Sequence, residues 1–490
     1  MNTYWADLHN HNEIGYGAGS IERTYAIARG SLDILALSVH GFWPDPPDLD
    51  PALVAYHEKG FARVRERFVE VVRLARDSTR PDSFVSLVAF EWHSLAWGDF
   101  VILFPGDEGD LCRAGDFAEL TEFARQNEAV MIPHHVAYAH GSRGLDWTAL
   151  NEMDSPLVEI FSEHGNSLER EGIHSMVGHS MGGATHSQCA MEHLRRGRRF
   201  GFSAGTDNHD GHPGSHGEGL TAVLAESLSR KAVIDAIRKR HTYAVTGDRM
   251  RLSMECNGAI MGDVLAHREA RTFQIEVDPL CPLESVQVLK NGSPAAIWAP
   301  VGAGNTKPDG EYLVRFEWGW DRMNCPDVTN WKINLEITDG ALAKVYPCFV
   351  GGPSSEELIN AFERISDTEL SIQSFTSRSN PHPVSGIVVA VNGNPDTVMR
   401  CQVASVTGAD AGGCEMQTSI RQLQGDDQWG AVLPRFSSPR IRIGRAYQKE
   451  NLAFKYTWKD EKKPERDFYI LKAQQKNGQT GWSSPLFFQE

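Results

Sequence analysis

Residues 32–40 read Leu32-Asp33-Ile34-Leu35-Ala36-Leu37-Ser38-Val39-His40, an almost continuous apolar run that ends in a histidine. Comparable short runs recur through the first half of the chain: Phe84–Phe90, Phe100–Phe104, Ala129–Ile132, Leu157–Phe161, Phe200–Ala204 and Leu220–Leu224. Because these runs do not alternate with polar residues, they are typical of parallel strands buried on both faces. Segments with helical periodicity, such as 61–75, lie between them. The repeated strand–helix units predict an α/β barrel or a doubly wound sheet.

The second half has a different pattern, and the change falls near Gly247. Residues 272–277 (Thr-Phe-Gln-Ile-Glu-Val) and 332–337 (Lys-Ile-Asn-Leu-Glu-Ile) alternate apolar with polar side chains, and turn pairs such as Asn291-Gly292 occur between such segments. Alternation and tight turns of this kind indicate antiparallel strands. We therefore predict a β-rich, sandwich-like domain after the α/β part.

These patterns place the domain boundary near residue 250. We expect an α/β domain over residues 1–250 and the β-rich domain over residues 251–490. Ser354 and Glu357 form a capping-box pattern before several apolar residues, which predicts one helix near 354–366 inside the β-rich domain.

The composition excludes several classes of protein. The chain has 490 residues, of which 41% are hydrophobic and 23% charged, with a net charge of −16. Its acidity opposes binding to nucleic acid or anionic lipid, and its apolar runs are far shorter than the roughly 20 residues that span a bilayer. The N-terminal segment lacks the features of a signal peptide, and the cysteines form no C-x-x-C pair. We expect a cytoplasmic enzyme with reduced thiols and neither a nucleic-acid nor a membrane partner.

Histidine is distributed unevenly along the chain. Of the 19 histidines, only His267 and His382 lie beyond His241. Histidines that are only exposed surface residues would be spread over both halves of the chain. The skew therefore indicates that the first half uses imidazole for a function.

Many of these histidines, together with several acidic residues, directly follow the apolar runs. They are grouped at Asp7–His11, His40, Glu91–His93, His134–His135, Glu159–His164 and Asp207–His209. In a parallel barrel the carboxyl ends of the strands meet where active sites lie. Imidazole and carboxylate are the ligands that borderline divalent metals prefer, and an H-x-H pair in extended chain points both rings to one side. The sequence thus predicts a metal-dependent site.

The same motifs resemble the polymerase-and-histidinol-phosphatase (PHP) superfamily. The resemblance covers about residues 1–250 and rests on Asp7-Leu8-His9-Asn10-His11, His40, Glu91, Pro133-His134 and Gly205-Thr206-Asp207-Asn208-His209. Short patches at 159–165, 257–258 and 481–485 are similar to a group of uncharacterised PHP-like bacterial proteins with a β-rich tail. The resemblance implies a distorted (β/α)7 barrel with two or three divalent metal ions (Mn, Zn or Fe), and hydrolysis of a phosphate ester.

The resemblance also implies a role for each matching residue. The implied metal ligands are His9, His11, His40, Glu91, His134, His164, Asp207 and His209. Glu91 would bridge two ions, and His134 would bind the second ion with His164 as its partner. A metal-activated hydroxide would attack phosphorus, while an imidazole protonates the leaving group. The candidates for that catalytic imidazole are His40, His164 and His209, and the expected substrate is a small anionic phosphate ester.

Three positions depart from the family pattern. Val39 stands where relatives have an aspartate, so another group must orient His40. The stretch Gly98-Asp99-Phe100 lacks a histidine found in many relatives, which leaves His93 or Asp99 as the substitute ligand. Glu13 is the nearest polar candidate for a further ligand expected after the H-x-H pair. The number of metal ions therefore stays open.

Three other functions compete with phosphate ester hydrolysis. The same hydroxide could cleave another ester or an amide. A degenerate metal site would leave a binding protein, in which tryptophans of the β-rich domain (Trp298, Trp318, Trp320, Trp331 and Trp482) could stack on sugars, although aromatic residues of a sandwich are usually core residues. Gly178-His179-Ser180-Met181-Gly182 matches the nucleophile elbow of serine esterases, with Ser180 as nucleophile. The residues before Ser180 do not form a clean strand, so we favour a loop beside the metal site.

Overall fold

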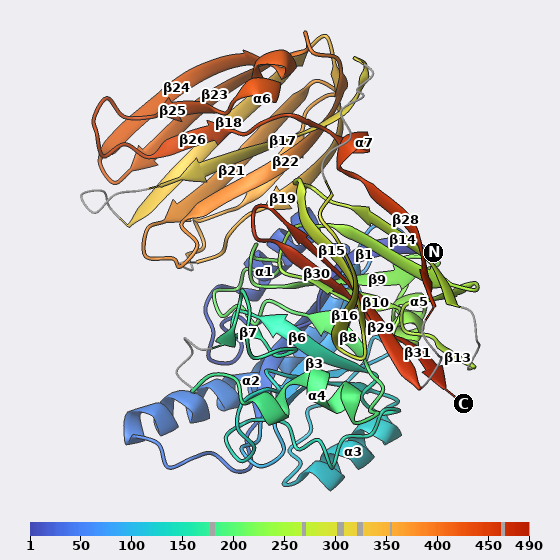
Figure 1. The fold of residues 1–490 in the computed structure, drawn as a ribbon. Coiled ribbons are helices and arrows are strands. Elements are labelled where there is room, and N and C mark those ends of the chain that lie inside the picture. The colour runs from blue at the N-terminus through green and yellow to red at the C-terminus, as the bar shows by residue number, and fades with distance from the viewer. Residues whose placement is uncertain are drawn as a thin grey trace.

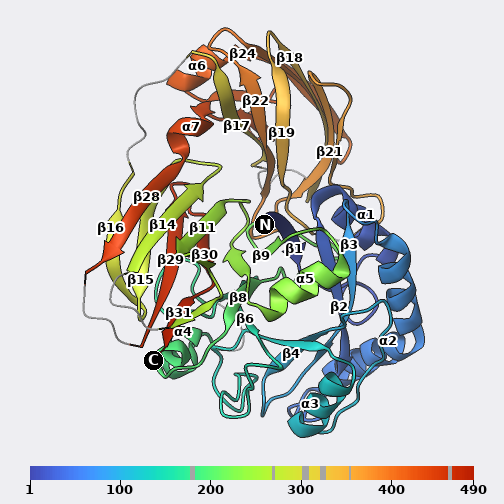
Figure 2. The ribbon, with the colours of Figure 1, turned by 90° about the vertical axis from the view of Figure 1, so that its right-hand side faces the viewer.

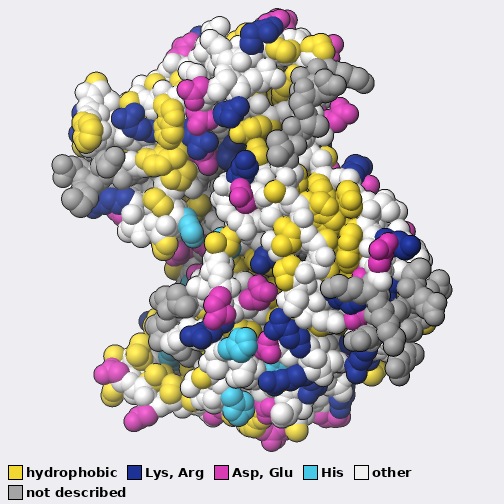
Figure 3. Space-filling model, viewed as in Figure 1, with side chains coloured by type: hydrophobic (Ala, Val, Ile, Leu, Met, Phe, Trp, Pro, Cys, Tyr) yellow, Lys and Arg dark blue, Asp and Glu magenta, His cyan; other side chains and the backbone are white. Residues whose placement is uncertain are grey.

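The structure is a computed structural model of the chain. It describes residues 1–176, 182–266, 271–300, 308–320, 327–352, 355–461 and 466–489. An α/β part lies at the bottom of Figure 1 and a β-rich part at the top. Figure 3 shows a deep indentation between these two parts on the left of the molecule.

Three parallel strands form the core of the α/β part. Strand β1 (Asn2–Asp7) pairs with β2 (Ile34–Phe42), and β2 pairs with β3 (Val85–Trp92). Helix α1 (Ile21–Ser31) connects the first two strands, and α2 (Pro51–Ser78) connects the second and third. Both helices begin at an N-cap residue: the Ser20 and Asp50 side chains accept hydrogen bonds from backbone N–H groups of the first turn. Figure 2 shows α2 and α3 (Phe117–Gln126) on the outer side of the sheet.

The strands on either side of these three pair antiparallel with their neighbours. Strand β4 (Asp99–Leu103) is antiparallel to β3 and to β5 (Val130–His134), while β9 (Leu220–Ala225) is antiparallel to β1 and to β10 (Thr242–Val245). The expectation that the apolar runs at 100–104 and 220–224 are parallel strands was therefore wrong. Their continuous apolar character has another cause, because alternate residues of these strands pack into two different core clusters. A continuous apolar run therefore indicates that both faces of the strand are buried, and it does not indicate the direction in which the strand runs.

The sheets do not close into a barrel in the described ranges. Strands β6 (Leu157–Ser162), β7 (Gly165–Asn166) and β8 (Gly201–Ala204) form a separate three-stranded sheet. It lies beside the main sheet, with β6 next to β5 and β8 next to β10. The closed (β/α)7 barrel implied by the PHP resemblance is thus not seen as a continuous ladder of hydrogen bonds.

The end of the chain returns to the first sheet. Strand β30 (Thr480–Ser483) pairs with β10, and β29 (Asp467–Gln475) and β31 (Leu486–Gln489) extend the sheet from there. This sheet also takes in β13 (Val264–Ala266), β15 (Leu283–Lys290) and β16 (Ser293–Trp298). The change of pattern near residue 250 is real, but residues 467–489 complete the sheet that residues 1–250 begin.

Two further sheets pack face to face as a sandwich at the top of Figure 1. One has the order β19-β22-β17-β26-β25 with β27 beside β17, and the other has the order β20-β21-β18-β23-β24. Their strands are β17 (Gly310–Gly319), β18 (Val328–Thr338), β19 (Ala341–Cys348), β20 (Ala361–Arg364), β21 (Glu369–Ser377), β22 (Val384–Gly393), β23 (Val398–Thr407), β24 (Asp410–Ser419), β25 (Gln428–Ala431), β26 (Arg440–Ile443) and β27 (Tyr447–Gln448). The alternating residues of β18 put Trp331 and Ile333 into the sandwich core, as the sequence pattern predicts.

The remaining elements are short or lie at the edges. A four-stranded sheet joins the two parts and consists of β11 (Arg251–Cys256), β12 (Ala259–Ile260), β14 (Arg271–Asp278) and β28 (Phe454–Asp460). The other helices are α4 (Ala190–Arg195), α5 (Arg230–Arg238), α6 (Ile420–Gly425), α7 (Lys449–Leu452) and a 3-10 helix, His186–Gln188. Among the described helices none combines the length and the apolarity that crossing a membrane requires.

The helix expected near 354–366 is not formed. Ser354 lies outside the described residues, and Ala361–Arg364 forms the edge strand β20, which pairs with β21. Pairing with an existing sheet edge outweighs a local capping pattern, because it satisfies backbone hydrogen bonds along the whole segment.

Candidate metal centre

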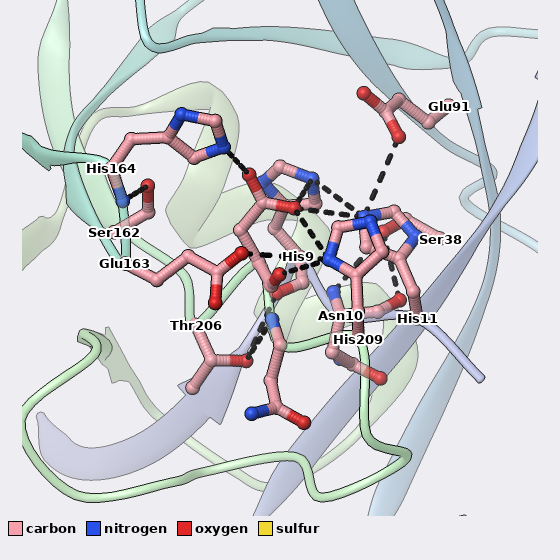
Figure 4. Close-up of polar contacts among 12 residues, drawn as sticks. His9, Asn10, His11, Ser38, Glu91, Ser162, Glu163, His164, Thr206 and His209 are labelled. Atoms are coloured by element: carbon pink, nitrogen blue, oxygen red, sulfur yellow. Dashed lines mark hydrogen bonds and ion pairs between the residues drawn. The ribbon is translucent and has the colours of Figure 1, made fainter. Parts of the chain in front are cut away.

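All eight sequence-predicted site residues lie in one place, at or just beyond the ends of strands. They are His9 and His11 after β1, His40 in β2, Glu91 in β3, His134 at the end of β5, His164 after β6, and Asp207 and His209 after β8. Figure 4 shows His9, His11 and His209 close together, with Glu91 and His164 on different sides of them. All except His164 and His209 are buried.

The carboxylate of Asp207 lies at the centre of three histidines. Its Oδ1 is 3.3 Å from His9 Nε2 and 3.0 Å from His11 Nε2, and its Oδ2 is 2.9 Å from His164 Nε2. The Asp207 N–H donates to His9 O at 2.8 Å, and the His11 N–H donates to Asn208 O at 2.9 Å. These backbone hydrogen bonds bring the loops after β1 and β8 together. Asp207 has φ 54°, a conformation that is uncommon for a residue other than glycine.

Glu91 lies between two sets of histidines. Its Oε1 is 2.9 Å from His134 Nε2 and 3.2 Å from His93 Nδ1, whereas its Oε2 is 3.5 Å from His11 Nε2 and 3.8 Å from His40 Nε2. Each carboxylate oxygen therefore faces a different group of imidazoles. This is the position that a carboxylate bridging two ions would occupy.

The residues present fit a divalent metal. His9 Nε2 and His11 Nε2 are 3.2 Å apart. Burial lowers the pKa of His9, but the carboxylates of Asp207 and Glu159 outweigh it and raise that pKa well above its ordinary value, as they would favour any cation held here. Glu91 Oε2 and both ring nitrogens of His134 are buried without a hydrogen bond of good geometry to the described residues. Sets of ligand atoms within 4.8 Å of one another that could hold an ion include His9–His11–Asp207, His9–Glu91–His134, His40–Glu91–His93, Asp99–His134–His135 and His11–His40–His209.

Burial sets the protonation of several of these groups. It lowers the pKa of His11, His40 and His134 well below the ordinary value, so that these rings are neutral and can offer a lone pair. Burial also raises the pKa of Glu91. For Asp207 burial acts in the same direction, but His9 and His164 outweigh it and hold the pKa of that carboxyl well below its usual range.

Two acidic residues that the sequence analysis did not assign support the ligands from behind. Glu159 lies 3.1 Å from His9 Nδ1 through Oε1, on the side of the ring away from Asp207. Asp7 accepts hydrogen bonds from the Thr206 N–H at 3.1 Å, the Thr206 hydroxyl at 2.6 Å and the Gly214 N–H at 2.9 Å. Glu159 thus fixes the tautomer and orientation of the His9 ring, whereas Asp7 fixes the backbone of the turn that precedes Asp207. Their strand-end positions, Asp7 in Asp-x-His and Glu159 at the end of an apolar run, are the signals that could have revealed them.

The structure also shows what surrounds Val39 and Phe100, the two positions that depart from the PHP pattern. Val39 is buried in the core, and among the described residues no carboxylate contacts His40 Nδ1, although Glu91 Oε2 lies 3.8 Å from His40 Nε2. The Tyr16 N–H donates to His40 Nδ1 at 3.5 Å, and the two rings stack with centroids 3.5 Å apart. Phe100 is likewise a core residue. His93 contacts Glu91 and could serve as a metal ligand in place of the histidine that Phe100 lacks.

The other suggested substitute, Asp99, is already engaged. Its Oδ2 lies 3.1 Å from His93 Nδ1 and 3.3 Å from His135 Nε2, and it accepts from Arg143 Nε at 2.7 Å. Arg143 and His93 hold the pKa of Asp99 well below its usual range, although burial opposes them. Asp99 therefore orients His93, and His93 is the better ligand candidate.

Ser180, the alternative nucleophile, lies outside the described residues. Trp318 and Trp331 are buried in the sandwich core, so they cannot stack on a sugar. Of the three candidate proton donors, His209 is the most exposed, with 37% of its side chain accessible, against 9% for His164 and 1% for His40.

Comparison with known proteins finds similarity without a characterised function. Residues 185–270 match the family model described as "Protein of unknown function (DUF3604)". An uncharacterised protein of Chlamydia muridarum is 25% identical over 214 residues, which is 40% of this chain and 34% of that protein. One from Chlamydia trachomatis is 27% identical over 172 residues, 33% of this chain and 27% of that protein. The chain spans about a third of the length of these relatives.

A solved structure from Bacteroides vulgatus covers more of the chain. It is described as a two-domain protein containing a predicted PHP-like metal-dependent phosphoesterase, is 12% identical, and matches 85% of this chain and 95% of its own with a TM-score of 0.32. Because this similarity is low, the functional conclusion rests on the geometry of the site.

Proposed function

We propose that this protein is a hydrolase that uses divalent metal ions, and that its substrate is a phosphate ester. The observation that carries the proposal is the convergence of His9, His11 and Asp207 with Glu91 and His134, all buried, in which Glu91 Oε2 and both ring nitrogens of His134 lack a well-formed hydrogen bond to the described residues. Burying so many polar atoms without partners is costly unless an ion completes the site.

Two ions account best for the arrangement of the ligands. His9, His11 and Asp207 would hold one ion and His134 the other, with Glu91 between them and His93 as a further ligand of the second. When bound, such ions lower the pKa of a water molecule and neutralise charge on a phosphoryl group. Glu159 and Asp99 would keep His9 and His93 in orientation.

Among the chain's own groups, His209 is the best proton donor to a leaving group. It lies at the mouth of the site, with Nδ1 3.5 Å from Glu163 and Nε2 3.2 Å from His40 Nε2. Its exposure lets it reach a substrate, whereas His40 is enclosed by Tyr16 and His11. His40 would then position His209, and His164 would position Asp207.

We also propose the barrel-like fold that the PHP resemblance implies. The β6–β8 sheet lies where it would continue the main sheet around the site, between β5 and β10. A PHP-type barrel with two open seams would place all the ligands on one rim. Cleavage of another ester or an amide by the same site stays an alternative.

The test is metal analysis of the purified full chain, combined with a chelator-controlled screen of phosphate esters. We expect about two divalent ions per chain and turnover that is lost with a chelator and regained with metal. Turnover that survives the chelator and falls in Ser180→Ala would favour the serine esterase instead. Bound metal without turnover on phosphate, carboxylic ester or amide substrates would indicate a binding protein.

A further inference from the structure

Tyr138 is a buried tyrosine in the loop after β5, and its hydroxyl lies at the edge of the metal centre. Its ring is fully enclosed and packs with Ala137, Met176 and Cys189 in a small hydrophobic cluster. The hydroxyl oxygen lies 2.7 Å from His164 Nδ1. The packing therefore fixes the direction of the hydroxyl, and the proposed function gives this residue no role.

His164 connects Tyr138 with Asp207. While Nδ1 faces the tyrosine, the other ring nitrogen, Nε2, is 2.9 Å from Asp207 Oδ2. The backbone is held as well, because the N–H of Glu163 donates to Thr206 O at 3.2 Å and so ties this loop to the turn before Asp207. Figure 4 shows the His164 ring on one side of the centre and Glu91 on the other. Tyr138, His164 and Asp207 thus form a continuous line of polar contacts, the Tyr138–His164–Asp207 triad.

The chemistry of the triad fixes where its protons lie. A carboxylate that binds a metal carries no proton, so the hydrogen between Asp207 and His164 belongs to Nε2. A neutral imidazole protonated at Nε2 has its lone pair at Nδ1, and the Tyr138 hydroxyl is the donor beside that atom. Both ring nitrogens of His164 are then engaged, and neither has a lone pair to offer to an ion.

The triad also determines which oxygen Asp207 offers to an ion. Oδ2 accepts from His164, whereas Oδ1 is 3.3 Å from His9 Nε2 and 3.0 Å from His11 Nε2. Asp207 has φ 54°, and a residue other than glycine keeps such a conformation only where its surroundings hold it. The His164 N–H is one of the contacts that hold its side chain.

We propose that Tyr138 is a positioning residue of the metal centre that acts through His164, and that His164 is not a metal ligand. The inference rests on the proposed function, because it takes Asp207 to be a metal ligand. It departs from the role implied by the PHP resemblance, in which His164 binds the second ion. Groups that hold a ligand in orientation strengthen metal binding without touching the ion.

Metal affinity of the full chain, measured by competition with a fluorescent chelator, tests the inference, and native mass spectrometry counts the ions. Tyr138→Phe keeps the ring and removes the hydroxyl, so we expect roughly three- to tenfold weaker metal binding. His164→Gln keeps an N–H donor for Asp207 and lacks an acceptor for Tyr138. We expect it to bind as many ions as the wild-type protein, with roughly tenfold lower affinity.

A double variant shows whether Tyr138 acts through His164. In the His164→Gln background, Tyr138→Phe should have no further effect, because the contact that transmits it is already absent. Tyr25→Phe is the matched control, since Tyr25 is also buried and its hydroxyl lies 3.1 Å from Ser86 Oγ near the start of β3. This control should bind metal like the wild-type protein.

Loss of an ion in His164→Gln would overturn the inference, because it would identify His164 as a ligand. So would a Tyr138→Phe variant that binds metal like Tyr25→Phe, or effects of the two substitutions that add in the double variant. Absence of metal from the wild-type protein would contradict both proposals.

Turnover of phosphate esters, measured in parallel, separates the inference from the proposed function. The expected pattern of affinities without turnover supports the triad and contradicts the function. Metal-dependent turnover with unchanged affinity in Tyr138→Phe supports the function and overturns the triad.

Discussion

At the scale of single residues, Asp207 and Glu91 hold the candidate centre together. Asp207 contacts His9 and His11 through one oxygen and His164 through the other. Glu91 contacts histidines through both of its oxygens. These two carboxylates supply the negative charge that makes a site of many neutral imidazoles attractive to divalent ions.

Asp207→Asn should therefore remove metal and activity together. The amide keeps the shape of the carboxylate but lacks its charge, so we expect loss of at least one ion per chain and a fall in kcat/KM on the order of 10³–10⁴-fold. Mass spectrometry of the native protein and steady-state kinetics measure the two effects. The exposed Asp110→Asn serves as control, and full metal occupancy in Asp207→Asn would refute the ligand assignment.

Glu159→Gln tests a residue that acts through a ligand. The amide would weaken the charge-assisted contact to His9 Nδ1 without touching the ion. Changes of this kind lower metal affinity by about 10- to 100-fold. Competition with a fluorescent chelator measures that affinity. Glu255→Gln, at an exposed position of β11, should leave it unchanged, and an equally unaffected Glu159→Gln would show that Glu159 does not position His9.

At the scale of elements, the turn after β8 decides how the ligands meet. Gly205 is at this turn, where its N–H donates to Phe161 O at 3.3 Å and the chain passes directly against β1. A Cβ on Gly205 would lie 2.5 Å from His9 Cβ and 2.6 Å from Glu159 Oε2. The close approach of two backbones thus requires glycine, as a buried turn beside a ligand often does.

Gly205→Ala should destabilise the fold and disturb His9. We expect a loss of about 1–3 kcal/mol in the free energy of unfolding, because the methyl group has no space among buried groups. Gly30→Ala is a matched control near the end of α1, where an added Cβ meets nothing within 4 Å. That control should gain about 0.5–1 kcal/mol. Urea unfolding of the two variants compares them directly, and equal stabilities would contradict the packing described here.

At the scale of the whole molecule, Asp248 connects three distant parts of the chain. It is fully buried and accepts from His216 Nε2 at 2.9 Å, Gln475 Nε2 at 2.8 Å and Asn477 Nδ2 at 2.9 Å, and it pairs with Arg315 of β17 in the sandwich. Arg315 holds the pKa of Asp248 well below its usual range, although burial opposes it. The carboxylate therefore fixes the sandwich to the α/β part.

Asp248→Asn should loosen that junction. Removing one partner of a buried ion pair leaves the Arg315 charge uncompensated, which costs about 3–5 kcal/mol. Differential scanning calorimetry should show a lower Tm or the two parts unfolding in separate transitions. Glu276→Gln is the control, because its exposed pair with Lys455 contributes little. A Tm for Asp248→Asn equal to that of this control would contradict the role of Asp248.

The same junction predicts a pH dependence of stability. Burial lowers the pKa of His216, but Cys348 and Asp248 outweigh it and raise the pKa to about 9, from an ordinary value of 6.5. The folded state therefore binds the proton more tightly than the unfolded state. Its stabilising contribution, about 3 kcal/mol, is complete below pH 6.5 and is lost as the pH rises from 6.5 through 9.

Urea unfolding at pH 6.5 and pH 9 measures this loss. The decline in His216→Gln should be smaller than in the wild-type protein by that amount. Groups that do not interact with His216 affect both proteins alike, so the difference reports His216 together with its neighbours Cys348 and Asp248. Identical declines would show that the pair with Asp248 contributes nothing.

Much of the site could be predicted because its residue types and its strand ends are local features. An apolar run followed at once by His40, Glu91 or His134 is visible without any knowledge of contacts, and these residues do converge. The contact of Glu159 with His9 joins residues 150 positions apart, and no local pattern records it.

The sequence by itself determined roughly where the buried strands of the first half lie, which half is rich in histidine, and which side chains stand near strand ends, since burial and backbone preference act over a few residues. Only the tertiary structure decided the direction of β4 and β9, the return of β29–β31 to the first sheet, and the strand at 361–364 in place of a helix. Those outcomes depend on which partner each segment meets, and a buried strand has the same apolar pattern whichever way its neighbour runs.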